Sequence, residues 1–294
     1  MNTLHRDKQI EIIAALTEGC SIRSVERLTS VHRDTIMRLG ARVGQGCARL
    51  HDYRMVGLRV GRCELDELWS YVGRKQRRTR PEDEAVTGDQ YVFVALASAA
   101  KAIVSYRVGK RNSDTTDEFV ADLRWRVIGQ PEVSTDGLVW YERAIRQAFG
   151  NSIAYGQIIK NYVGEPARDA ARRYSPGVVV AVNRQVVSGA PAQISTSYVE
   201  RSNLTVRMAS RRFTRLTNGF SKKLENHAAA FGLFVSHYNW CRVHEATRVT
   251  PAMSLGLADH PWSIGELLDA ALGYELNKPR AQRRRFRLIQ GGRS

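Results

Sequence analysis

The order of strand-like and helix-like segments between residues 62 and 200 constrains the fold of this chain most strongly. Three segments rich in strand-forming residues come first, at 62–72, 91–97 and 103–108, and a turn at 98–101 joins the last two. We expect these segments to pair as consecutive antiparallel strands. They are followed by a helix from Ser113, a short strand at 131–137, a helix at 140–149 and a late helix from Tyr198.

This order matches an RNase H-like core, an α/β fold with a mixed sheet. In that fold the first strand carries an acid near its middle, the fourth strand ends in an acid, and a later helix contributes a third. Asp66, Asp136 and Glu200 occupy these three places. An Asp-Gly pair is most often a turn and a strand acid most often faces solvent, so the pattern alone also fits three unrelated surface acids.

Three such acids would suit a magnesium site, because Mg²⁺ is a hard cation that prefers oxygen ligands. Two ions about 4 Å apart would assist the attacking and leaving oxygens of a phosphoryl transfer. We expect Asp66 to bridge the two ions, Asp136 to share one ion and Glu200 to complete the other. Mn²⁺ is the expected substitute for Mg²⁺.

The charge balance predicts a polyanionic partner. Lys and Arg number 45 against 29 Asp and Glu, a net charge of +16. Glu200 is followed by a basic stretch with no second acid until Glu225. The residues we expect to contact DNA there are Arg207, Arg211, Arg212, Arg215, Lys222 and Lys223.

The first 50 residues carry a helix-turn-helix pattern. An amphipathic segment stops at Gly19, Ser21 can cap a short second helix, and a tight turn leads to a basic third helix from Arg33. That helix would offer Arg33, Thr35 and Arg38 to a DNA groove. The alternative is an all-α bundle that serves only packing or dimerisation.

The predicted organisation is an all-α helix-turn-helix domain at 1–50, a linker at 51–61, the RNase H-like catalytic domain at 62–276 and a basic, disordered tail at 277–294. Within the catalytic domain we expect 160–177 to be irregular, 178–187 to form a hairpin with the residues after it, and 223–242 to form one long helix.

Several longer motifs resemble the DDE transposases of the bacterial insertion sequence one family. They lie at 66–72, 135–137, 195–205, 212–223, 237–244, 250–253 and 259–262. The resemblance implies a DDE triad at Asp66, Asp136 and Glu200, Mg²⁺ dependence, and cutting and joining of double-stranded DNA at element ends and targets. It also implies a homo-oligomer on DNA and a cytoplasmic, nucleoid-associated protein. Unlike some members, the chain lacks the paired cysteines of an N-terminal zinc ribbon.

Other interpretations of the same residues remain open. The chain could be a non-catalytic DNA-binding regulator that retains the fold, or an RNase H-like nuclease. His237, Cys241 and His244 share one helical face, as zinc ligands do, although a packed helix is the simpler reading. The reserve carboxylates are Glu64, Glu67, Asp114 and Asp117. On an alternating strand Glu64 faces the same way as Asp66, whereas Glu67 faces the other way. Aromatic residues that could stack on DNA bases are Trp69, Tyr71, Trp125, Trp140 and Phe213.

The remaining composition argues against secretion and membrane insertion. The four cysteines form no C-x-x-C pair, as expected of a reduced cytosol. No apolar run approaches 18 residues, and no signal-peptide pattern opens the chain.

Overall fold

The computed structural model describes residues 4–163, 178–214 and 218–273, and its sheet is built around β2 (Arg62–Val72). The six strands run in the order β4-β3-β2-β6-β7-β8. β2 pairs antiparallel with β3, β3 antiparallel with β4, and β2 and β7 each pair parallel with β6. The other strands are β3 (Gly88–Ala97), β4 (Ala102–Gly109), β6 (Glu132–Asp136), β7 (Tyr155–Val163) and β8 (Val178–Ser188). The predicted α/β fold with a mixed sheet is confirmed.

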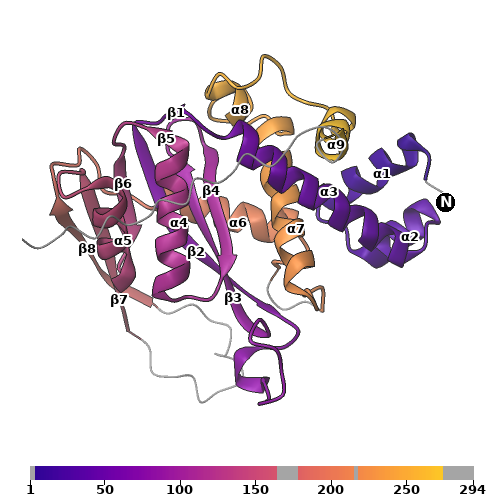
Figure 1. Ribbon diagram of the computed structural model, residues 1–294, viewed down its shortest axis with the longest axis horizontal. Helices are drawn as coiled ribbons and strands as arrows, with labels where there is room; N and C mark the ends of the chain where they lie inside the picture. The colour runs from indigo at the N-terminus through magenta and orange to yellow at the C-terminus, as the bar shows by residue number, and fades with distance from the viewer. Residues whose placement is uncertain (1–3, 164–177, 215–217, 274–294) are drawn as a thin grey trace, which may run out of the picture.

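Helices cover both faces of this sheet, as Figure 1 shows. Alternation along β2 sends Cys63 and Leu65 into a core shared with α4 (Ser113–Arg126) and α5 (Val139–Phe149). Leu68 points the other way, into a core shared with α6 (Ser197–Ala209) and α7 (Leu224–Ser236). Two short strands, β1 (Leu58–Arg59) and β5 (Val127–Ile128), pair in parallel beside the main sheet.

The N-terminal part is three helices, at the places the sequence predicts. They are α1 (Arg6–Thr17), α2 (Ile22–Thr29) and α3 (Arg33–Arg54). Ser21 caps α2 by accepting a hydrogen bond from the amide of Ser24. α3 continues to Arg54, so residues 51–54 of the predicted linker are helical. None of the helices in the described residues is long and apolar enough to cross a membrane.

α3 packs on α7 and α9 (Ile264–Gly273) at very short range, through two glycines. A Cβ added at Gly44 would lie 2.0 Å from the carbonyl oxygen of Ala229 in α7. A Cβ added at Gly46 would lie 2.2 Å from that of Ala271 in α9. The N-terminal helices therefore share one hydrophobic core with the C-terminal helices.

The chain departs from the sequence-based prediction in three further places. β7 runs from Tyr155 to Val163, although the chain from residue 160 was expected to be irregular. β8 pairs with the preceding strand β7 rather than with the residues after it. The helix predicted to reach residue 242 ends at Ser236 and continues as a π-helical turn, His237–Cys241, before α8 (Pro251–Ser254). The tail predicted at 277–294 lies outside the described residues.

Candidate active site

Three carboxylates meet where β6 ends beside β2. One oxygen from each of Asp66, Glu67 and Asp136 lies within 4.8 Å of the others. Asp66 and Asp136 were predicted to meet, whereas Glu67 was expected to face away. The pairing of β2 with β6 stops at Leu65, so the next two residues of β2 have no strand partner on that side. Because that edge is open, side chains from both faces of β2 reach the end of β6.

Each carboxylate is fixed by a different neighbour. Asp66 accepts a hydrogen bond from the amide of Asn203 on α6 at 2.8 Å. Asp136 accepts one from the backbone N–H of Leu138 at 3.0 Å. Glu67, whose side chain is only 3% exposed, accepts one from the hydroxyl of Tyr141 on α5.

The electrostatics of this cluster favour a bound cation. Burial, and then the charge of Asp136, raises the pKa of Asp66 to about 7. The same two causes raise the pKa of Glu67 to about 8. Burial also raises the pKa of Asp136. Arg111 supplies one positive charge, 3.2 Å from Glu67 and 3.7 Å from Asp136. Three converging carboxylate groups beside one arginine form a donor set that fits a hard divalent cation.

Glu200 lies outside the close cluster but lines a cleft together with Asp66 and Glu67. The cleft has a volume of about 290 Å³, and its walls are Asp66, Glu67, Leu68, Glu200, Asn203, Leu204 and Arg207. Glu200 stands in the first turn of α6, where it accepts hydrogen bonds from the ammonium of Lys160 at 2.5 Å and the hydroxyl of Thr196 at 2.6 Å. Lys160 lies on β7, in a stretch predicted to be irregular, so sequence periodicity did not point to it.

A buried carboxylate ties α6 to β2. Glu64 is 0% exposed, and its Oε2 accepts hydrogen bonds from the backbone N–H groups of Tyr198 and Val199 at 2.8 and 3.1 Å. Its Oε1 accepts one from Ser98 at 3.2 Å. These two N–H groups belong to the first turn of α6, which is also the turn that carries Glu200. Glu64 therefore sets the position of Glu200 relative to Asp66.

The basic residues that follow Glu200 differ in their surroundings. Arg207 lines the cleft and donates to the backbone carbonyls of Trp69 and Phe213 at 3.2 and 3.0 Å. Arg212 is half-buried and donates to Ser221, and burial lowers its pKa. Arg211, Lys222 and Lys223 are exposed, and Arg215 lies outside the described residues.

The residues predicted to enter a DNA groove begin α3. Arg33 and Arg38 are exposed, and the half-buried Thr35 accepts a weak hydrogen bond from Arg38 at 3.5 Å. Figure 1 places α2 and the start of α3 at the opposite end of the molecule from β6. These residues therefore lie far from the carboxylate cluster.

The zinc interpretation gains no support from the described residues, among which His237, Cys241 and His244 form no group of three converging ligands. Of the aromatic candidates, Phe213 is buried at 2% exposure and Trp140 packs partly against the core. Trp125 is 55% exposed on α4, while Trp69 and Tyr71 are half-buried on β2.

Comparisons with known proteins give one sequence relative and several structural likenesses. No family model matches the chain. Over 176 residues it is 24% identical to the Insertion element iso-IS1n protein InsB of Shigella dysenteriae, a match that covers 60% of this chain and 95% of that protein. The piggyBac transposase synaptic complex with hairpin DNA matches with a TM-score of 0.38 at 11% identity, over 95% of this chain and 73% of that one. The Mos1 transposase paired-end complex gives 0.21 at 13% identity, over 50% and 57%.

TM-scores below 0.5 do not establish a shared fold, so the fold rests on the strand order and directions described above. The sequence relative is an insertion-element protein, and nearly its whole length is matched.

Proposed function

We propose that this chain is a DDE-type transposase that cuts DNA at the ends of an insertion sequence and joins the freed ends to target DNA. The observation that carries the proposal is the meeting of Asp66, Glu67 and Asp136. Two of these carboxylates, Asp66 and Glu67, also line a cleft with Glu200. The net charge of +16 suits a DNA partner. The similarity to an insertion-element protein supports the same class.

The site residues divide into ion-binding and DNA-binding groups. Asp66, Asp136 and Glu200 would hold the divalent ions, Mg²⁺ or Mn²⁺, and Glu67 is a fourth candidate ligand. Such ions would neutralise charge that develops on the phosphate oxygens during the reaction. Arg207 lines the cleft, and its positive charge would suit a contact with a DNA phosphate there.

The N-terminal helices would bind double-stranded DNA at the element end through Arg33, Thr35 and Arg38. Arg211, Arg212, Arg215, Lys222 and Lys223 would contact the flanking backbone, and two or more copies would bring two ends together. Of these steps, strand cleavage is the one in which the carboxylate cluster would take part directly.

The test is strand cleavage and strand transfer on a duplex that carries an element end, with Mg²⁺. Asp66→Ala and Glu200→Ala should each lower cleavage by at least about 10³-fold, because each removes a ligand of the ions that stabilise the transition state. Binding of the same duplex in EDTA should stay within a few-fold of wild type. The matched control is Glu118→Ala, which removes an exposed acid of α4 that pairs with Arg107.

Full cleavage by either variant would refute the assignment of that residue as an ion ligand of the active site. Wild-type cleavage without joining of a pre-cut 3′ end would make the chain a nuclease, and DNA binding without cleavage would make it a regulator.

A further inference from the structure

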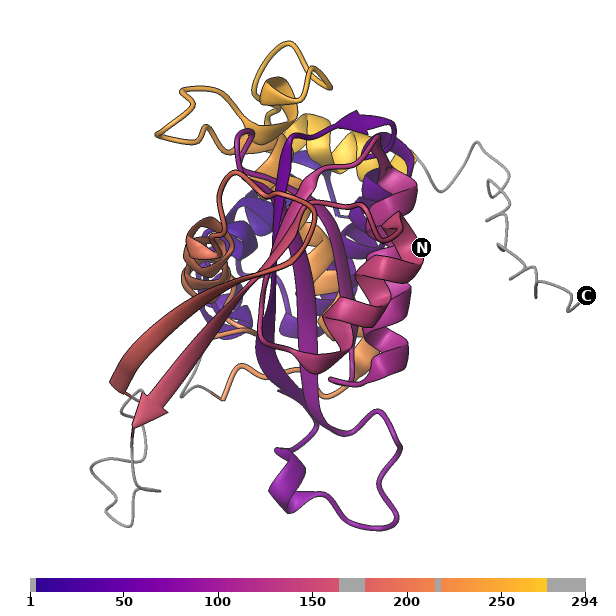
Figure 2. The same cartoon turned by 90° about the vertical axis from the view of Figure 1, so that its left-hand side faces the viewer.

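A second pocket lies farther along β2, beyond the carboxylate cluster. It has a volume of about 580 Å³, and the residues that line it are Trp69, Lys75, Gln76, Arg77 and Asp89. We call it the Trp69 slot. It lies where the β2–β3 hairpin projects beyond the rest of the sheet, a projection visible in both Figure 1 and Figure 2. The roles proposed above for the ions and for DNA binding do not use this pocket, although Trp69 is one of the aromatic candidates that the sequence offers.

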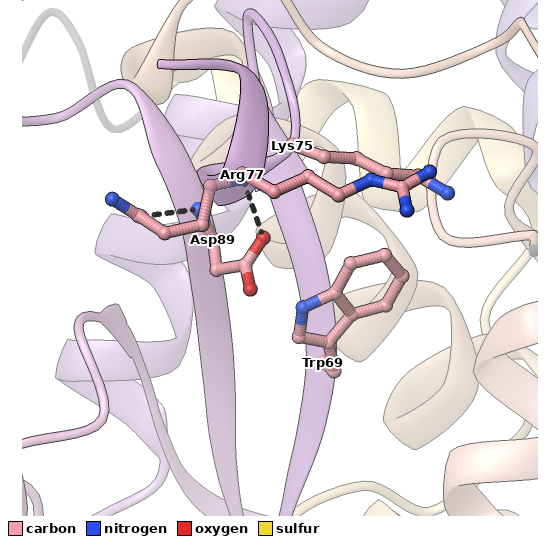
Figure 3. A pocket seen from close by; sticks show the side chains of 5 residues that line it. Trp69, Lys75, Arg77 and Asp89 are labelled. Atoms are coloured by element: carbon pink, nitrogen blue, oxygen red, sulfur yellow. Dashed lines mark hydrogen bonds between the residues drawn. The ribbon is translucent and has the colours of Figure 1, made fainter. Parts of the chain in front are cut away.

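The floor of the Trp69 slot is aromatic and its upper edge is cationic. The ammonium of Lys75 lies 5.9 Å from the centre of the Trp69 ring. Figure 3 shows the side chains of Lys75 and Arg77 extended past the indole, with the carboxylate of Asp89 beside it. Tyr71 flanks Trp69 at 5.8 Å between ring centres, and Phe220 supports Tyr71 at 4.9 Å. The indole is therefore held in place while its slot stays open.

The slot is preformed by hydrogen bonds across the hairpin. The short helical turn η1 (Gln76–Arg78) is pinned to β3, because the amide of Gln76 donates to Asp89 and the amide of Asp89 donates to the side chain of Gln76, each at 3.1 Å. Gly88, at φ +100°, permits this approach, since a Cβ there would lie 2.3 Å from the side-chain oxygen of Gln76.

The cations in and around the slot differ in their ion pairs. Arg74 and Arg80 pair with Asp83 and Glu82 of the same loop. In the part of the chain that the structure describes, no carboxylate forms an ion pair with Lys75 or Arg77. An aromatic face beside unpaired cations is the combination that binds a nucleobase with its phosphates.

Trp69 lies on the same face of β2 as Glu67, one of the three carboxylates of the cluster. Trp69 follows Glu67 by two residues, a separation of about 6.6 Å along a strand. Stacked nucleotides repeat about every 3.4 Å along one DNA strand. A base stacked on Trp69 would therefore belong to the first or second nucleotide from a phosphate at the cluster. Arg111 links the two sites, since it pairs with Glu67 and lies 5.8 Å from the ring of Tyr91, the cross-strand partner of Trp69.

From this geometry we infer that the Trp69 slot binds one unpaired DNA base, one or two nucleotides from the phosphate that is cut. Lys75 and Arg77 contact the phosphates on either side of that base. The base must be unpaired because duplex bases hide their faces in the stack. This inference rests on the proposed function, since it assigns a DNA contact beside the proposed active site.

The test measures binding in EDTA, so that it does not depend on cleavage. Equilibrium binding to the full chain is followed for a single-stranded oligothymidylate and for a blunt duplex of equal length, at one fixed salt concentration. Trp69→Ala should weaken single-strand binding by about 5- to 150-fold, the loss that corresponds to one base–aromatic stack. Trp69→Phe should restore most of it, and duplex binding should change less than about 2-fold.

The matched control is Trp125→Ala, which removes a more exposed tryptophan, 55% exposed, from α4. It should leave both affinities unchanged. A 2-aminopurine placed one or two nucleotides from the cut in an element end should change its fluorescence on binding wild type and Trp69→Phe but not Trp69→Ala. Lys75→Ala with Arg77→Ala should reduce the salt dependence of single-strand binding by roughly 0.7 per lost phosphate contact.

Equal single-strand affinities for wild type and Trp69→Ala would overturn the inference that the slot binds a base, and would leave the proposed transposase function intact. Wild type that binds neither DNA would overturn both proposals. If DNA binding and the effects of the Trp69 variants are as expected but no cleavage occurs, only the proposed transposase activity would be overturned.

Discussion

Glu67 is the residue whose place was least expected. Alternation along a strand puts neighbouring side chains on opposite faces, and on that rule Glu67 should face away from Asp66. The rule holds, since Glu67 contacts Tyr141 of α5 and Asp66 contacts Asn203 of α6 on the other face. The two side chains still meet, because β2 loses its partner β6 after Leu65, which opens one edge. The positions of Asp66, Asp136 and Glu200 followed from the order of elements. The approach of Glu67 depends on where a neighbouring strand ends, and that end is not visible in the sequence of β2.

Glu67→Gln should stabilise the chain in the absence of metal at high pH. The pKa values of Asp66 and Glu67 are raised to about 7 and 8, so between about pH 4 and 8 the folded chain keeps protons that the unfolded chain has released. Stability therefore falls as pH rises through this window. Thermal melts in EDTA should show the variant at least roughly 2 °C above wild type at pH 8, with no difference at pH 4.

Divalent metal should reverse the order of the two melting temperatures, so that wild type melts above Glu67→Gln. Mg²⁺ should raise the melting temperature of wild type at pH 8 more than that of Glu67→Gln, because the ion binds the folded state through these carboxylates. The control Glu118→Gln should follow wild type in every condition. Identical melts for Glu67→Gln and wild type in EDTA at pH 8 would count against the raised pKa of Glu67.

At the scale of elements, the strands with clear alternation were predicted well. The pattern at 62–72 matches the bounds of β2, because half of that strand packs against each core. The outer part of β7 was predicted to be irregular, since beyond Ile158 it no longer pairs with β6 and is held only by its pairing with β8. Hydrophobic periodicity reports burial, so it does not mark a strand held mainly by its neighbour's hydrogen bonds.

The contact between α6 and β2 gives a test at this scale. Glu64→Leu keeps similar volume but leaves the N–H groups of Tyr198 and Val199 without their acceptor. We expect a loss of about 2–4 kcal/mol in the free energy of unfolding in urea, and loss of Mg²⁺-dependent cleavage as α6 shifts Glu200.

Glu64→Gln is the matched control, because its amide oxygen can face α6 while its NH₂ group faces the hydroxyl of Ser98. It should keep most of the stability and cleavage. If Glu64→Leu unfolds like wild type, the backbone amides of α6 do not depend on Glu64.

At the scale of the whole molecule, the N-terminal helices and the sheet are joined through α7 and α9. The sequence predicts three helices there but does not indicate this shared core. The apolar residues that complete the core lie more than 180 residues after Leu50, the last core residue of α3. They are Leu233, Leu267, Leu268 and Ala271. The use of these helices for binding DNA stays a prediction.

Gly44→Ala tests this joint. In an ordinary helix interior the change would stabilise by about 1 kcal/mol. Here the new methyl group would meet the carbonyl of Ala229, so we expect unfolding in urea to become easier by about 1–3 kcal/mol. The control Gly61→Ala, with nothing within 4 Å of its added Cβ, should change stability by less than about 1 kcal/mol. A stabilised Gly44→Ala would mean that α3 and α7 are not in this close contact.

Under the DNA-binding role proposed for the N-terminal helices, the backbone contact at Gly44 also limits how a new DNA specificity could arise. Helices α1–α3 cannot be exchanged as an independent unit, because the replacement would require a matching surface on α7 and α9 at the same time. New specificity is instead open to substitutions on the solvent side of α2 and α3, where Arg33 and Arg38 stand clear of the shared core. A chimera should therefore transplant surface side chains and leave both glycines in place.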